Sequence, residues 1–216
     1  MRIAHGSARV LAIAVTMGAT LALAAAGDNA LERFLDGLTS LRTTFEQTVK
    51  DAKGHVIERS SGELVVVRPG KFRWEVHPAD EKGAGELLIA DGKNIWYFDR
   101  DLEQVTVKPL SGALSATPAM LLAGGEDLHA RFELQSAPAA EGLEWVRVTP
   151  RGADADFREA RIGFAHNELK RMVLQDKLGQ LTTLNMSHSE RNVPVDPALV
   201  SFKPPAGADV IGTPLP

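Results

Sequence analysis

The sequence predicts a mainly β protein built around one strongly curved antiparallel sheet. Three observations lead to this fold class. Short segments of alternating polarity follow one another, turn residues separate them, and only two helical patterns interrupt the series. Strands spaced this closely are joined by hairpins, which makes the sheet antiparallel. About eleven strands in one open sheet should curl strongly, because wide sheets twist and bend.

The composition is that of an ordinary globular protein. The 216 residues are 44% apolar and 24% charged, with 28 acidic and 24 basic side chains. This balance offers no basic stripe, so a nucleic-acid partner is excluded. The chain has no cysteine, which rules out a disulfide framework, a zinc–thiolate site and a cysteine nucleophile.

Residues 1–26 resemble a secretory signal peptide. Two arginines precede an apolar run that begins at Val10 and ends in small residues at Ala26. This run is about 17 residues long, shorter than the ~20 that a membrane-spanning helix needs. We therefore expect cleavage after about Ala24 or Ala26, export to the periplasm, and a single mature domain over residues 27–216.

Two stretches predict short helices. Near the N-terminus, Asp28 or Asn29 can cap a helix with one apolar stripe. The stripe consists of Leu31, Phe34, Leu35, Leu38 and Leu41. Farther along, Thr117 as N-cap and Pro118 in the first turn predict a second helix, which ends at Gly124.

The remaining segments predict strands and one extended tail. The strands are expected at about 43–50, 55–67, 71–77, 87–90, 94–98, 103–108, 130–136, 143–149, 159–165, 169–175 and 180–189. The turn Asp91-Gly92-Lys93 between two apolar runs is the strongest hairpin signal. The tail from Asn192 is rich in proline and glycine, and we expect it to run mostly extended along the surface.

Several strands are apolar on both faces. In the segment 94–98, Ile95 and Tyr97 alternate with Trp96 and Phe98. An antiparallel sheet with one solvated face alternates apolar and polar residues, so here both faces need cover. Two short helices cannot cover one face of a large sheet. A concave sheet with an apolar space for a lipid-like ligand is one explanation, and a sandwich with a filled core is the other.

Signals for catalysis and metal binding are weak. The six histidines do not pair at a ligand spacing, and no zinc-protease, serine-hydrolase, Walker A or dinucleotide motif occurs. We therefore expect no enzyme, no catalytic residue, no metal and no cofactor. A periplasmic hydrolase whose Ser, His and Asp come together only in the fold is the alternative.

The segment Val67–Glu75, with the sequence VRPGKFRWE, resembles the periplasmic lipoprotein carrier family LolA. The resemblance covers essentially the whole mature chain, in order. It continues through the stretches Phe45–Gln47, Asp91–Tyr97, Thr117–Leu122 and Phe202–Gly207. It implies an incomplete, strongly curved antiparallel β-barrel, covered by a lid of short α-helices and enclosing an apolar cavity.

The implied function is that of a monomeric carrier. The family takes triacylated lipoproteins from the inner-membrane ABC transporter LolCDE to the outer-membrane receptor LolB. A specialised relative that carries another lipid or a glycolipid is one alternative, and a regulator that senses stray lipoproteins is another. Such regulators carry a second domain, which this chain is too short to provide. The receptor shares the fold but needs a lipid-modified cysteine, which this sequence lacks.

The resemblance also assigns roles to individual residues. Arg68 matches the arginine that donates to backbone carbonyls of the lid and holds the empty form closed, a task suited to the five donors of a guanidinium. The other matched positions line the cavity or the lid. They are Leu35, Phe72, Trp74, Trp96, Met120 and Leu121. For these residues ordinary core packing is the alternative, and for Arg68 the alternative is a solvated strand end.

Overall fold

Twelve strands form one sheet in the computed structural model, which describes residues 29–80, 83–110, 118–124, 128–152, 155 and 157–216. In the described chain the strands are β1 (Ser40–Lys50), β2 (Val56–Val67), β3 (Lys71–Pro78), β4 (Glu86–Asp91), β5 (Asn94–Asp99), β6 (Gln104–Pro109), β7 (Phe132–Ala140), β8 (Leu143–Pro150), β9 (Phe157–Ala165), β10 (Glu168–Asp176), β11 (Leu181–Arg191) and β12 (Asp209–Ile211). Their order in the sheet is β12-β6-β5-β4-β3-β2-β1-β11-β10-β9-β8-β7. All neighbours are antiparallel except β12 and β6, which run parallel.

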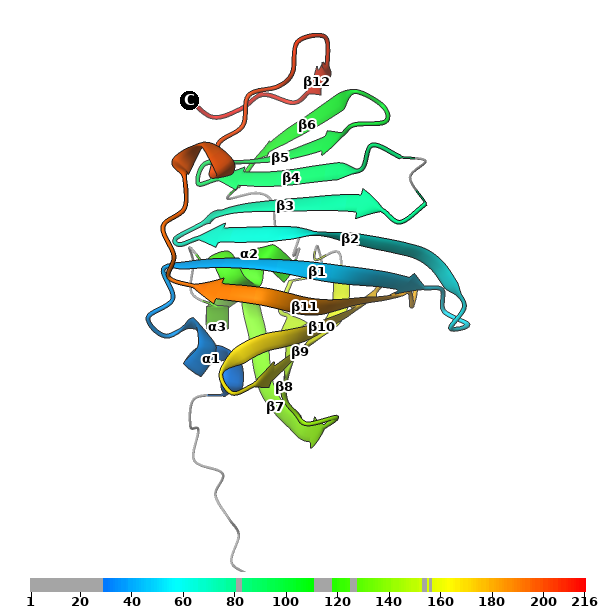
Figure 1. Cartoon of the computed structure of the whole chain (residues 1–216), viewed down its shortest axis with the longest axis vertical. Coiled ribbons are helices and arrows are strands. Elements are labelled where there is room, and N and C mark those ends of the chain that lie inside the picture. The colour runs from blue at the N-terminus through cyan, green and yellow to red at the C-terminus, as the bar shows by residue number, and fades with distance from the viewer. Residues whose placement is uncertain (1–28, 81–82, 111–117, 125–127, 153–154, 156) are drawn as a thin grey trace, which may run out of the picture.

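The sheet curls without closing, as the sequence predicts (Figure 1). Strands β7 and β12 are its two edges, so the barrel is incomplete. The long strands β1 and β2 lie near its middle and pair along their whole length. The mainly β fold class and the strong curvature are therefore confirmed.

Short helices cover part of the inner side of this curl. The α-helices of the described chain are α1 (Ala30–Leu35), α2 (Pro118–Ala123) and α3 (Leu128–Arg131), and the 3₁₀-helix is η1 (Pro197–Val200). Helix α2 contacts β2 and β3, whereas α1 contacts β8 and β9. Apolar side chains of α1 and α2 join one hydrophobic core with the inner face of the sheet. Helix η1 lies on the opposite side of the sheet from α2 (Figure 1) and contacts β2, β3 and β4.

The first helix is shorter than its apolar stripe predicts. Asn29 caps α1 in a capping box with Glu32, but the helix ends at Leu35. Gly37 then adopts a positive φ of 62°, which turns the chain into β1. Leu41, expected on the helix, belongs to β1, where its side chain is fully buried. The stripe identified core residues correctly but assigned its last part to the wrong element.

The hairpins follow the turn signals closely. Gly92 and Lys93 join Asp91, the last residue of β4, to β5, and the φ of Gly92 is +97°. Strand boundaries in the described chain lie within a few residues of the predicted ones, whereas α3, η1 and the short β12 were not predicted. The proposed N-cap Thr117 and the whole signal peptide lie outside the described residues.

Two hydrophobic cores lie on the two faces of the sheet. The larger core lies on the inner face, where Phe34 of α1 packs on Phe164 of β9 with ring centroids 5.3 Å apart. The smaller core lies on the outer face of β5 and β6 and contains Trp96, Val105 and Val107. The tail covers this second core, so the prediction of a tail lying along the surface is confirmed for its described part.

Candidate functional site

A groove of about 1070 Å³ opens on the inner face of the sheet. Its apolar side chains come from neighbouring strands and face the same way because side chains alternate along a strand. They are Trp74 and Val76 of β3, Leu88 of β4, and Ile95 and Tyr97 of β5. At one end, Val56 and Ile57 of β2 add apolar side chains that are 39% and 56% exposed.

The register of the strands explains how this floor forms. Leu88 lies opposite Trp74 on one side and opposite Tyr97 on the other. Directly opposed residues have side chains close enough to pack, so these three form a continuous row. Trp74 also packs against Phe45 of β1, with ring centroids 5.1 Å apart. The row is thereby anchored to the inner core at one end and open to solvent at Tyr97, which is 36% exposed.

A polar wall borders this apolar floor. It includes Thr106 and Lys108 of β6, together with Glu86 of β4. Tyr97 stands between floor and wall, and both Tyr97 and Glu86 line the groove. Burial raises the pKa of the Tyr97 hydroxyl well above its ordinary value, and the negative charge of the neighbouring Glu86 carboxylate raises it further. The hydroxyl is therefore a neutral donor throughout the physiological range.

The helices cover the rest of the inner face. Leu35 of α1, Phe72 of β3 and Leu121 of α2 are buried together in the inner core, and Met120 packs against that core while partly buried. These four do not line the open groove in the described structure. Of the residues assigned to the cavity or lid, Trp74 alone lines the groove, as part of its apolar floor.

The placement of Trp96 needs correction. The family resemblance places it among the cavity residues, but it lies on the outer face with Val105 and Val107. Its ring packs on Phe202 of the tail at a centroid distance of 5.5 Å, and its Nε1 donates to Asp91 at 2.7 Å. Alternation along β5 explains this, because Ile95 and Tyr97 face the groove and Trp96 must therefore face away.

Arg68 lies where the covering helices end. Its Nη1 donates to the carbonyl oxygen of Leu35, the last residue of α1, at 2.8 Å. Its guanidinium also lies against Gly124, because a Cβ built there would be 2.8 Å from Nη2. Gly70, two residues after Arg68, donates its backbone N–H to Ala123 of α2 at 3.0 Å. The turn after β2 therefore contacts the ends of both helices.

A second arginine at the end of α1 was missed by sequence reasoning. Arg191 of β11 donates from Nη2 to the carbonyl oxygen of Phe34 at 2.8 Å. Its guanidinium carbon lies 4.7 Å from the centroid of the Phe34 ring, a cation–π geometry. Phe34 and Arg191 are 157 residues apart, so no local pattern could have predicted the contact.

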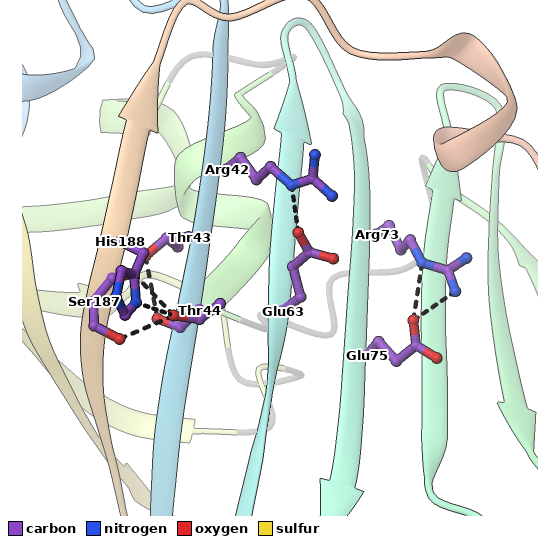
Figure 2. A network of polar contacts seen from close by, with 8 residues as sticks. All are labelled: Arg42, Thr43, Thr44, Glu63, Arg73, Glu75, Ser187 and His188. Atoms are coloured by element: carbon purple, nitrogen blue, oxygen red, sulfur yellow. Dashed lines mark hydrogen bonds and ion pairs between the residues drawn. The ribbon is translucent and has the colours of Figure 1, made fainter.

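The outer face of the central strands is polar. Figure 2 shows Arg42 of β1 paired with Glu63 of β2, and Arg73 paired with Glu75 within β3. Burial raises the pKa of Glu75, but hydrogen bonds from Arg73 and Arg100 outweigh it and hold the pKa below its usual value. This face is therefore suited to water, in contrast to the groove behind it.

In the part of the chain that the structure describes, no helix is long and apolar enough to cross a bilayer. Nor do the residues of that part bring three or more histidine, aspartate or glutamate side chains together in a group able to hold a metal ion.

A solvent-open groove with an apolar floor, set in a curled sheet, is typical of a binding protein for lipid-like ligands. The sequence identifies the particular family. Residues 36–203 match the model described as "Outer membrane lipoprotein carrier protein LolA", and the chain belongs to this family.

Two sequence relatives agree with this assignment. An outer-membrane lipoprotein carrier protein of Dechloromonas aromatica is 41% identical over 182 residues, which cover 84% of this chain and 86% of the relative. Another, of Methylobacillus flagellatus, is 35% identical over 207 residues, covering 94% and 99%. A solved LolA superfamily protein of Nitrosomonas europaea is 10% identical, with a TM-score of 0.45, over 82% of this chain and 99% of that one.

Proposed function

We propose that this protein is a periplasmic carrier that binds the acyl chains of outer-membrane lipoproteins and moves them through water. The observation that carries the proposal is the open groove with an apolar floor of Trp74, Val76 and Leu88 on the inner face of the sheet. The relatives named as outer-membrane lipoprotein carrier proteins support it, since they match this chain over most of its length.

The physical chemistry of the cargo makes such a carrier necessary. Three fatty chains contain roughly 45 methylenes, and at ~0.8 kcal/mol each their transfer out of water is worth ~35 kcal/mol. Unassisted release from a membrane into water is then negligibly slow. A carrier must replace most of that apolar contact and still release the chains, so a groove that fits them loosely is better than one that matches them closely.

In this proposal the helices over the inner core act as a lid. Leu35, Met120 and Leu121 bury their side chains when the lid is closed and expose apolar surface to the acyl chains when it opens. Arg68 is the latch, and its hydrogen bond to the Leu35 carbonyl at 2.8 Å supports this role. Phe72, which is fully buried in the same inner core, would become part of the enlarged cavity.

The partners follow from the same family. The carrier would accept triacylated lipoproteins from the inner-membrane transporter LolCDE and deliver them to the outer-membrane receptor LolB, acting as a monomer without a cofactor. Residues 1–26 would direct export and be removed after about Ala24 or Ala26, leaving one carrier domain over 27–216. The protein would act by binding and not by catalysis.

A release assay tests this proposal. The mature protein is added to spheroplasts that display a tagged triacylated lipoprotein, and the soluble fraction is examined for a one-to-one complex. We expect the wild type to form this complex, and Arg68→Ala to alter its transfer to outer membranes. Arg158→Ala, which removes an exposed arginine of β9, is the matched control and should behave as the wild type.

The outcome that contradicts the proposal is equally specific. A folded wild-type protein that forms no soluble complex, while the transporter is active, would exclude a general lipoprotein carrier. If Arg68→Ala and Arg158→Ala transfer the lipoprotein to outer membranes equally well, Arg68 is not a latch. That result would not contradict the carrier function.

A further inference from the structure

A surface of different composition lies on the outer face of β8, β9 and β10, away from the groove. In the sheet, β2, β1 and β11 separate these strands from the groove floor in β3, β4 and β5 (Figure 1). On their inner face Val146, Ile162 and Met172 belong to the inner core, so the residues that alternate with these three face outward. This outer surface is therefore distinct from the groove.

The strand register assembles the outward side chains into two rows. Trp145 of β8 lies opposite Gly163 of β9, which lies opposite Arg171 of β10. The second row lies two residues away on each strand and consists of Arg147, Arg161 and Val173. Directly opposed residues have Cβ atoms about 4.5–5.5 Å apart, so the two rows form one compact surface, here called the arginine patch.

Trp145 is the aromatic residue of the arginine patch. Its ring lies over Gly163, where a built Cβ would be 3.0 Å from both Cζ3 and Cη2 of the ring. Its Nε1 donates to the carbonyl oxygen of Ala140 at 3.1 Å. The ring is thus held in place while it is only half-buried. A fixed, partly exposed tryptophan beside arginines is typical of protein interfaces.

The charges of the arginine patch are unevenly matched. Arg171 pairs with Glu141 at 2.5 Å, but Arg147 and Arg161 lie directly opposite each other, where like charges destabilise a sheet. Both approach the single carboxylate of Glu159, at 3.3 Å and 3.7 Å, and their side chains remain 47% and 51% exposed. One carboxylate cannot neutralise two guanidinium groups. The pair therefore keeps an excess positive charge, although the whole chain has a net charge of −4.

We propose that the arginine patch binds an extended acidic segment of a partner protein. An apolar side chain of the segment lies on Trp145, and a carboxylate binds Arg147 and Arg161 through their paired N–H donors. Trp145 and Arg147 are two residues apart on one strand, which is also the spacing of side chains on one side of an extended peptide. The patch lies on the convex side of the curled sheet, where a flat membrane would make little contact (Figure 1). No groove residue takes part, so the proposal does not depend on the carrier function.

NMR titration of the isotope-labelled mature chain with synthetic peptides tests the proposal. The probe is a short serine peptide in which one leucine is followed, at two-residue steps, by two glutamates, and its counterpart carries lysines in their place. We expect the acidic probe alone to shift the amide signals of β8, β9 and β10. Arg147→Gln and Arg161→Gln should each weaken binding about three- to five-fold, the effect of one exposed ion pair. Trp145→Ala should also weaken it.

Two further variants separate binding from a structural role. Glu159→Gln should strengthen binding of the acidic probe about three-fold, because the resident carboxylate no longer competes for the two arginines. The denaturant midpoint of Arg147→Gln should be unchanged or higher, because a like-charge contact is removed. Arg42→Gln, which removes an outer-face arginine paired with Glu63, is the matched control and should leave probe affinity unchanged.

Each other outcome overturns the proposal. If both peptides bind equally, or if Arg42→Gln weakens binding as much as Arg147→Gln, the attraction is not specific to the arginine patch. A lower midpoint of Arg147→Gln with unchanged probe affinity would show that the arginines serve only the fold, and unchanged affinity of Glu159→Gln would show that its carboxylate does not occupy the site. If vesicles of phosphatidylglycerol bind through Arg147 and Arg161 while the acidic peptide does not bind, the surface recognises an anionic membrane instead. If neither binds, the patch is no docking site.

Discussion

The two faces of β5 show the difference between a core and a binding site. Trp96 and Phe98 face outward and are packed beneath Phe202 of the tail, whereas Ile95 and Tyr97 face the open groove. Both faces are apolar, and the same short strand contributes to each. The tail covers the outer face, whereas on the inner face Tyr97 is 36% exposed and lines the open groove.

This difference indicates what each face is for. An apolar surface covered by its own chain contributes to folding stability, since its burial is complete before any ligand arrives. An apolar surface left open on a folded protein indicates an external occupant. The outer residues should therefore control stability, and the groove residues should control binding.

The largest expected effect is on the outer face. Trp96→Ala removes a side chain that is 7% exposed and loses its contacts with Phe202, so we expect ~3–5 kcal/mol less stability. Leu88→Ala, in the half-buried groove floor, should cost less stability but weaken acyl binding. Denaturant titration and probe binding at a temperature where both variants are folded check this. If Trp96→Ala weakens probe binding more than Leu88→Ala does, the assignment of stability to the outer face and of binding to the groove is wrong.

The helix-covered part of the inner face provides the next prediction. Arg191→Ala removes both the hydrogen bond to the Phe34 carbonyl and the cation–π contact with its ring, and should cost ~2 kcal/mol. Arg68→Ala removes the bond to the Leu35 carbonyl and should cost ~1 kcal/mol. Denaturant midpoints give these values. Hydrogen exchange in α1 should be faster in both variants, and unchanged exchange would show that neither arginine holds this helix.

The tail that covers the outer face should contribute a similar amount. Asn94 is 3% exposed and bonds twice to Leu215, donating from Nδ2 at 3.1 Å and accepting at Oδ1 at 2.7 Å. Asn94→Ala should cost ~1–2 kcal/mol, because the backbone groups of Leu215 lose their partners. Limited proteolysis should then cut the tail faster. Asn185→Ala, at an exposed position of β11, is the control and should leave cleavage unchanged.

The smallest expected effect is the alkaline titration of Tyr97. Because burial and Glu86 raise the pKa of its hydroxyl, the neutral form stabilises the fold. That contribution is complete below the unfolded value of about 10 and is lost as the pH rises through the folded pKa. Tyr97 is the one tyrosine of the chain, so tyrosinate absorbance reports it directly. Titration at the ordinary pKa would contradict the described environment.

Local patterns were sufficient for most of the fold. Alternation located the strands, and the Asp91-Gly92-Lys93 turn fixed the hairpin between β4 and β5. The same alternation separates Trp96 from Tyr97, but it does not say which face is inner. That depends on Phe202 covering Trp96, a contact between residues more than a hundred positions apart.

The site was predictable only in part, for the same reason. Trp74 was identified, but Leu88 and Tyr97 of the groove were not, because their common row exists only after β3, β4 and β5 pair. The contact of Arg191 with Phe34 could not be predicted either, because it forms only where β11 lies beside the end of α1. Sequence periodicity reports which residues are buried within one element, whereas a site depends on which elements become neighbours.

The most direct test of the central claim uses the tryptophans on the two faces. The chain has three, so Trp96→Phe/Trp145→Phe leaves Trp74 in the groove, and Trp74→Phe/Trp145→Phe leaves Trp96 on the outer face. A triacylated lipopeptide with brominated acyl chains quenches a tryptophan that it contacts. We predict strong quenching of Trp74 and none of Trp96. Equal quenching of both, or quenching of Trp96 alone, would show that the open groove is not where the acyl chains bind.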